Sequence, residues 1–114
     1  MKQLIEIRTY TLNAGMSEQF QQVMGERSVP MLLAAGTDVV AARPSLHTPD
    51  VYLLIRAYSS LAQRSQSQDE FYASAEWIHG PRDAVMACID TYTTVVIEAD
   101  PFIIDGLRYL PQSA

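Results

Sequence analysis

Four segments of the chain have the alternation of apolar and polar residues, or the concentration of β-branched and aromatic residues, that is typical of β-strands. They span residues 4–12, 37–43, 51–58 and 91–97. A turn signal, Asn13-Ala14-Gly15, closes the first of them. The pattern therefore predicts four strands, with longer connections after the first and the third.

The connection after the first strand has a helical pattern. Pro30 lacks the N–H that would bond back to Glu26, so we expect this helix to kink or break near Val29. Gly36 is suited to end the region as a left-handed cap. Its apolar residues recur at helical spacing, at Phe20, Val23 and Met24.

The connection after the third strand also predicts helix, in three pieces. Ser60 and Gln63 have the spacing of a capping box. Residues 63–70 are almost wholly polar, which we interpret as a solvated face. A short turn follows at 74–77, and Gly80-Pro81 breaks the chain, with Pro81 suited to the first position of the last helix. That helix has an apolar face of Ala84, Val85, Cys88 and Ile89.

The order βαββαβ over residues 1–98 predicts an α+β, ferredoxin-like sandwich. Right-handed crossovers place the first and third strands at the centre of the sheet and the helices on one face. Residues 99–114 form a tail that is too apolar to remain in water. We expect this tail to dock, either along its own domain or across a partner subunit.

Each strand has two sets of side chains on opposite faces. We expect the small aliphatic sets, such as Ile5 and Ile7, to lie under the helices. The uncovered face would then carry the larger set: Glu6, Arg8, Tyr10, Tyr52, Arg56, Tyr58 and Tyr92. That face is too aromatic for water and too charged for a dry interior. A homodimer in which two such faces enclose a polar cavity resolves the conflict.

The composition of the chain excludes several classes of partner and location. The chain carries 8 Lys+Arg against 13 Asp+Glu, a formal net charge of −5, which argues against nucleic acid and against an anionic membrane surface as partners. No run approaches the roughly 20 apolar residues of a membrane span. A single cysteine, Cys88, excludes an internal disulfide. No signal-like stretch begins the chain, so we expect a cytoplasmic protein.

The candidate ligand-binding residues are the charged and aromatic residues that we expect on the uncovered face of the sheet. Arg8 and Arg56 could clamp a carboxylate or enolate oxygen, or could form a structural network with Glu6 that only fixes the dimer. The tyrosines could donate hydrogen bonds to a ligand or simply pack at an interface. His79 is the best general acid–base candidate, unless it is a surface histidine. No metal-ligand spacing and no nucleotide motif is present, so we expect neither a metal nor another cofactor.

Several motifs together resemble the NIPSNAP family over roughly residues 4–98. They are Glu6-x-Arg8-Thr9-Tyr10-Thr11-Leu12-x-x-Gly15, Phe20, Pro30…Leu33…Gly36, Val51-Tyr52-x-Leu54, Ala57-Tyr58-x-Ser60-Leu61 and Glu76-Trp77. The resemblance implies a dimeric α–β barrel, a fold class that also includes small monooxygenases and isomerases. NIPSNAP-like proteins are largely uncharacterised, so the resemblance implies little about activity.

Three functional hypotheses follow. The first is a homodimer that binds a small anionic or carbonyl-bearing organic molecule through the larger set. The second is a cofactor-independent monooxygenase or isomerase, in which His79 would exchange protons. The third is a non-catalytic interaction or scaffold module, whose interior would be filled by its own side chains.

Overall fold

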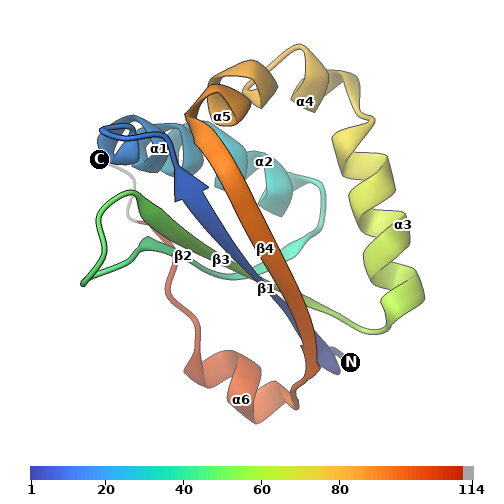
Figure 1. Ribbon diagram of the computed structural model, residues 1–114. Coiled ribbons are helices and arrows are strands. Elements are labelled where there is room, and N and C mark those ends of the chain that lie inside the picture. Colours follow the sequence, from blue (N-terminus) through green and yellow to red (C-terminus); the bar gives the residue numbers. More distant parts are fainter. Residues whose placement is uncertain (112–114) are drawn as a thin grey trace.

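The computed structural model describes residues 1–111 and confirms the α+β, ferredoxin-like fold (Figure 1). Its strands form one antiparallel sheet in the order β2-β3-β1-β4. The first and third strands are therefore central, as predicted. Their bounds are β1 (Leu4–Leu12), β2 (Asp38–Pro44), β3 (Val51–Tyr58) and β4 (Ile89–Glu98).

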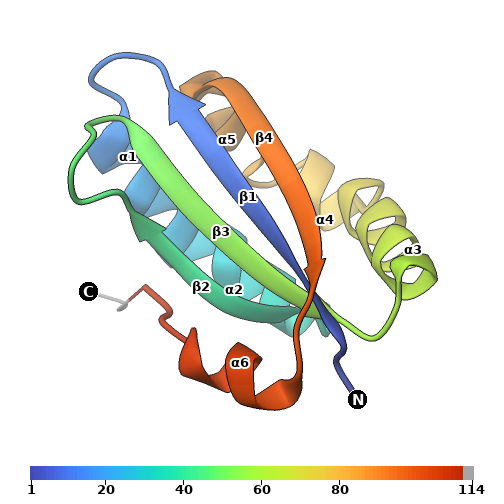
Figure 2. The ribbon, with the colours of Figure 1, turned by 60° about the horizontal axis from the view of Figure 1, so that its bottom comes forward.

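The helices fall on two sides of this sheet. All those that precede β4 lie on one face, whereas the last lies against the other face (Figure 2). Their bounds are α1 (Ser17–Val23), the π-helical turn η1 (Met24–Ser28), α2 (Val29–Ala34), α3 (Leu61–Tyr72), α4 (Ala75–Ile78), α5 (Arg82–Cys88) and α6 (Pro101–Gly106).

The first helical region is not broken at Pro30. The backbone stays helical from α1 into α2 and widens into η1 just before the proline. In that wide turn the Val29 N–H donates to the Met24 carbonyl, five residues back. Because Pro30 cannot bond back to Glu26, the expected kink or break near Val29 takes the form of a local π-helical turn directly before it, and the chain remains helical.

Local signals place most of the helix ends. Gly36 has φ +88, the left-handed conformation predicted for it. The Ser60 hydroxyl caps α3 by accepting from the Gln63 N–H at 3.0 Å. Pro81 differs from the prediction, because it is the N-cap of α5 rather than its first helical residue.

The two faces of the sheet are the reverse of the sequence prediction. Tyr10, Tyr52 and Leu54 pack under the helices with Phe20 and Trp77, in the larger of two apolar clusters. The aliphatic set of Ile5, Ile55 and Ala57 points to the other face, where it packs with residues of α6. Aromatic residues on the helices explain this choice, since Phe20, Phe71 and Trp77 leave a layer deep enough for large side chains.

The tail packs on its own subunit. Ile104 of α6 is buried against the open face, and Tyr109 extends the edge of β2. The Tyr109 N–H donates to the Val40 carbonyl at 2.9 Å, and the Ala42 N–H donates to the Tyr109 carbonyl at 3.0 Å. Arg108 adds an ion pair of 2.8 Å to Asp38. The last part of the predicted tail, residues 112–114, lies outside the described residues.

None of the helices within residues 1–111 is long and apolar enough to cross a membrane. In the same residues, no group of three or more His, Cys, Asp or Glu side chains is placed to hold a metal ion.

Candidate functional site

A buried carboxylate is the centre of the polar residues under the helices. Glu6 on β1 is 0% exposed. One of its oxygens is 2.5 Å from Nη2 of Arg56 on the neighbouring strand. Its other oxygen accepts from Arg64 Nε at 2.6 Å and from the Gln68 amide. The β1–β3 register pairs Glu6 directly with Arg56, so the sheet itself brings the two charges together.

The other partners come from α3, which sequence reasoning assigned to solvent. Arg64, Gln68 and Tyr72 recur every four residues along this helix, so they share one face, and that face points to the sheet. Tyr72 accepts a 2.8 Å hydrogen bond from Arg56 Nη1. One sequence signal could have indicated this arrangement, namely the near absence of apolar residues in 63–70. A helix that has no apolar stripe can cover a sheet only with polar side chains.

The network holds Glu6 and Arg56 in their charged forms. Burial by itself raises the pKa of Glu6, but the positive charge and hydrogen bond of Arg56 and the hydrogen bond of Gln68 outweigh burial and lower this pKa to about 2. For Arg56, burial disfavours the charge, whereas Tyr72, Tyr58 and Glu6 raise the guanidinium pKa above its usual range. Arg56 is 0% exposed and is fully engaged in this network except at Nε, which lacks a partner among the described residues.

Arg8 lies at the border of the network and is held less tightly than Arg56. Its Nη2 is 3.4 Å from Glu6, and its Nε donates to Thr94 Oγ1 at 3.2 Å. The guanidinium stacks over the Tyr92 ring, 4.9 Å from the ring centroid. These contacts orient the side chain and still leave donors of the planar fork unused.

Arg8 lines a cavity of about 360 Å³ between the sheet and the helices. This volume is at the small end of the range for ligand pockets and suits a single-ring molecule. The walls come from β1, β3, β4, η1, α2, α3, α4 and α5. They are formed by Arg8, Tyr10, Met24, Ser28, Leu32, Leu54, Gln68, Tyr72, Trp77, Arg82, Val85, Met86, Ile89 and Tyr92.

The charge of this lining is opposite to that of the protein. Two arginines, Arg8 and Arg82, line the cavity, and none of the lining residues is Asp or Glu. The chain as a whole has a formal net charge of −5. Arg82 was not singled out in the sequence, because only the fold places the start of α5 beside the end of the sheet. Arg82 is exposed and pairs with Asp83 at 3.1 Å, and Arg8 is 3.4 Å from Glu6, but neither carboxylate lines the cavity, so its two guanidinium groups favour an anion.

The cavity and its surroundings include most of the predicted ligand-binding residues. Arg8, Tyr10 and Tyr92 line it. Burial and the nearby Tyr72 raise the pKa of Tyr10 to about 12, so its phenol stays protonated and can donate. Glu6 and Arg56 belong to the adjoining network and do not line the cavity.

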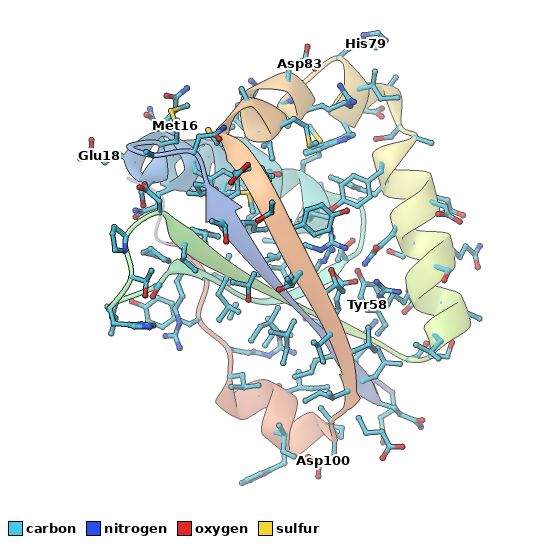
Figure 3. The ribbon with its side chains drawn as sticks, in the orientation of Figure 1. Met16, Glu18, Tyr58, His79, Asp83 and Asp100 are labelled. Atoms are coloured by element: carbon cyan, nitrogen blue, oxygen red, sulfur yellow. The ribbon has the colours of Figure 1, made fainter. Side chains whose placement is uncertain are left out.

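Two tyrosines and a histidine of the prediction lie elsewhere. Tyr58 sits between the sheet and α3, where its hydroxyl accepts from Gln68 at 3.2 Å (Figure 3). Tyr52 packs edge-on against Phe20 and lines a separate groove below α1. His79 follows α4 and is exposed on the outer side of the molecule, so the structure does not bring it to the cavity (Figure 3).

A larger groove lies between α2 and α3. Its volume is about 610 Å³, and its walls include Gln63, Glu70 and Glu76 but no arginine or lysine. The charged residues of this groove, Glu70 and Glu76, are both carboxylates, so it offers no site for the anion that the arginines of the smaller cavity favour. The smaller cavity next to the Glu6 network is therefore the better candidate site.

Comparison with known proteins supports the fold at low sequence identity. A NIPSNAP family protein of unknown function from Agrobacterium tumefaciens superposes with a TM-score of 0.78 at 21% identity, over 88% of this chain and 90% of that one. An uncharacterised NIPSNAP-like domain protein from Burkholderia xenovorans gives a TM-score of 0.79 at 15% identity, over 88% and 87% of the two chains. The chain has the fold of the NIPSNAP proteins.

The fold of this chain is also similar to that of a second group of solved structures. A candidate antibiotic biosynthesis monooxygenase from Bordetella bronchiseptica matches 88% of this chain and 99% of its own, with a TM-score of 0.67 and 16% identity. No protein-family model matches the sequence, and no curated protein matches it either. The similarity to known proteins is therefore one of fold.

Proposed function

We propose that this protein is a NIPSNAP-family homodimer in which each subunit binds a small aromatic or unsaturated carboxylate between its sheet and its helices. The observation that carries the proposal is the pair Arg8 and Arg82 in a cavity without Asp or Glu. A carboxylate suits the planar donor fork of an arginine. The aromatic walls, Tyr10, Tyr72, Trp77 and Tyr92, suit a flat ligand body.

Binding of benzoate tests this function. We expect saturable binding to the native protein by NMR titration, and about tenfold weaker binding to Arg8→Gln and to Arg82→Gln, since each removes one charged donor. Arg43→Gln is the matched control, because Arg43 is exposed and lies outside the cavity. Affinity unchanged in both cavity variants, with their thermal stability intact, would refute the proposal.

The dimer is proposed through the open face of the sheet. Val95 and Ile97 on β4 are 55% and 46% exposed, and Ile7 and Leu53 continue the apolar surface across β1 and β3. Exposed apolar residues that adjoin one another on a sheet are typical of an interface between subunits. Native mass spectrometry at micromolar concentration should therefore show two copies, and a single-subunit mass would contradict the dimer.

A binding role fits the cavity better than the enzymatic alternative, a monooxygenase or isomerase. The likeness to the candidate Bordetella monooxygenase is the observation in favour of catalysis. However, the lining contains no histidine, cysteine or carboxylate that could move a proton near neutral pH, and His79 is outside. Oxygen uptake or isomerisation of a bound carboxylate that persists in purified protein would favour catalysis over simple binding.

A further inference from the structure

Ser28 is a buried polar residue of the cavity whose side chain takes no part in the network around Glu6. It is the last residue of η1 and is 3% exposed, yet it lines the cavity. Among residues 1–111 its hydroxyl makes no hydrogen bond within the distance of an ordinary one. Among the described residues the fully enclosed side-chain atom without a partner is Arg56 Nε, so the Ser28 hydroxyl is not sealed off but open to the cavity, where another molecule can hydrogen-bond to it.

The Ser28 hydroxyl does not bond back to its own helix. In an ordinary helix a serine commonly donates to the carbonyl four residues back. Cys88 in α5 does so, with its Sγ 3.4 Å from the Ala84 carbonyl oxygen. For Ser28 that carbonyl belongs to Met24, which in the wide turn accepts from the Val29 N–H, and no bond from the Ser28 hydroxyl to it is found among residues 1–111.

The same turn brings both of its ends to the cavity. Met24 and Ser28 are the buried residues of η1, and both line the cavity. Met24 supplies a flexible apolar wall, whereas Ser28 supplies a donor and an acceptor. Local π-helical turns occur frequently at functional sites, in keeping with this position.

We propose that Ser28 binds a second, uncharged polar group of the ligand, so that the ligand is a ring carboxylate that carries a hydroxyl or carbonyl substituent. The inference rests on the proposed function, because it assigns the chemistry of the same cavity. The arginines select the anion, and Ser28 selects among anions. A carboxylate without the substituent binds but leaves the hydroxyl unpaired.

The test compares benzoate with 3-hydroxybenzoate and 4-hydroxybenzoate on the native protein and on Ser28→Ala. The native protein should bind at least one hydroxybenzoate about three- to tenfold more tightly than benzoate, the size of one net hydrogen bond. Ser28→Ala should lose this preference and bind all three with similar affinity. Ser65→Ala, an exposed serine of α3 outside the cavity, should keep the native preference.

The outcomes separate the two proposals. If benzoate binds in an Arg8-dependent manner but the native protein shows no preference, or if Ser28→Ala keeps the preference, the role of Ser28 is refuted and the proposed function stands. If none of the three probes binds saturably, the proposed function itself fails. Thermal denaturation of Ser28→Ala checks that the variant is folded.

Discussion

The two faces of the sheet differ in chemistry although they are built by the same strands. The face under the helices carries Glu6, Arg8 and Arg56 among tyrosines, whereas the opposite face carries Ile5, Ile7 and Ile55. The charged face is covered by the helices that precede β4, whereas the aliphatic face is covered only in part, by α6 over Ile5 and Ile55, and is open along β4 at Val95 and Ile97. Burial therefore follows the availability of partners rather than hydrophobicity alone.

The partners that make burial of charge tolerable come from α3. Arg64, Gln68 and Tyr72 satisfy Glu6 and Arg56 at the point where the sheet would otherwise bury them unpaired. An unpaired buried charge costs several kcal/mol, whereas a paired and hydrogen-bonded one is tolerated. The open face needs no such partners, and a second copy of the chain is the cover we propose for it.

Loss of the central carboxylate should have the largest effect. Glu6→Gln keeps the shape of the side chain but leaves Arg56 buried without a counter-charge, so we expect the free energy of unfolding to fall by about 3–5 kcal/mol. Urea denaturation measures this change. Glu98→Gln, on the exposed end of β4, should change it by less than about 0.5 kcal/mol. A loss below about 1 kcal/mol for Glu6→Gln would show that the network contributes little to stability.

Lowering the pH should gradually reproduce the loss of unfolding free energy that is expected for Glu6→Gln. The pKa of Glu6 is lowered from 4.5 to about 2 in the folded protein. A lowered pKa gives stability that is fully present above the unfolded value of 4.5 and is lost as the pH falls from there towards 2. The difference in unfolding free energy between the native protein and Glu6→Gln should therefore shrink across this window. A difference that stays constant from pH 6 to pH 2.5 would contradict the charged state assigned to Glu6.

A charge on the open face should act on assembly rather than on folding. Val95→Glu places a carboxylate in the proposed interface of both subunits, and we expect the dimer to weaken by about 2–3 kcal/mol, or roughly 30- to 150-fold in dissociation constant. Light scattering after size-exclusion chromatography measures the mass. Leu46→Glu, in the exposed loop after β2, is the control and should remain dimeric. An unchanged mass for Val95→Glu would exclude this face as the interface.

Removal of one hydroxyl should have the smallest effect. Tyr72→Phe deletes the acceptor of the Arg56 Nη1 hydrogen bond, and we expect a loss of about 1–2 kcal/mol in unfolding free energy. Tyr92→Phe is the control, since Tyr92 is half-exposed and its hydroxyl has no hydrogen-bond partner among the described residues. Equal effects of the two substitutions would mean that the Tyr72 contact does not hold Arg56.

Much of the fold was predictable because its signals are local. Strand β3 was predicted at its observed bounds, 51–58, and the Ser60 cap of α3 follows from two residues three positions apart. Short-range bonds and side-chain periodicity are decided within a few residues. Arg8, Tyr10 and Tyr92 were grouped correctly on one face for the same reason, although that face was assigned to the wrong side.

The sequence alone determined where the four strands and the helices before β4 lie, their order, and which side chains share a face of the sheet, but it did not predict the helix α6 in the tail. Only the tertiary structure decided which face the helices cover, that Arg82 and Ser28 join Arg8 around one cavity, and that His79 stays outside it. The physical reason is that alternation along a strand is symmetric between the two faces. That symmetry is broken only by what the distant helices bring, here the polar side of α3 and the aromatic side chains around Phe20.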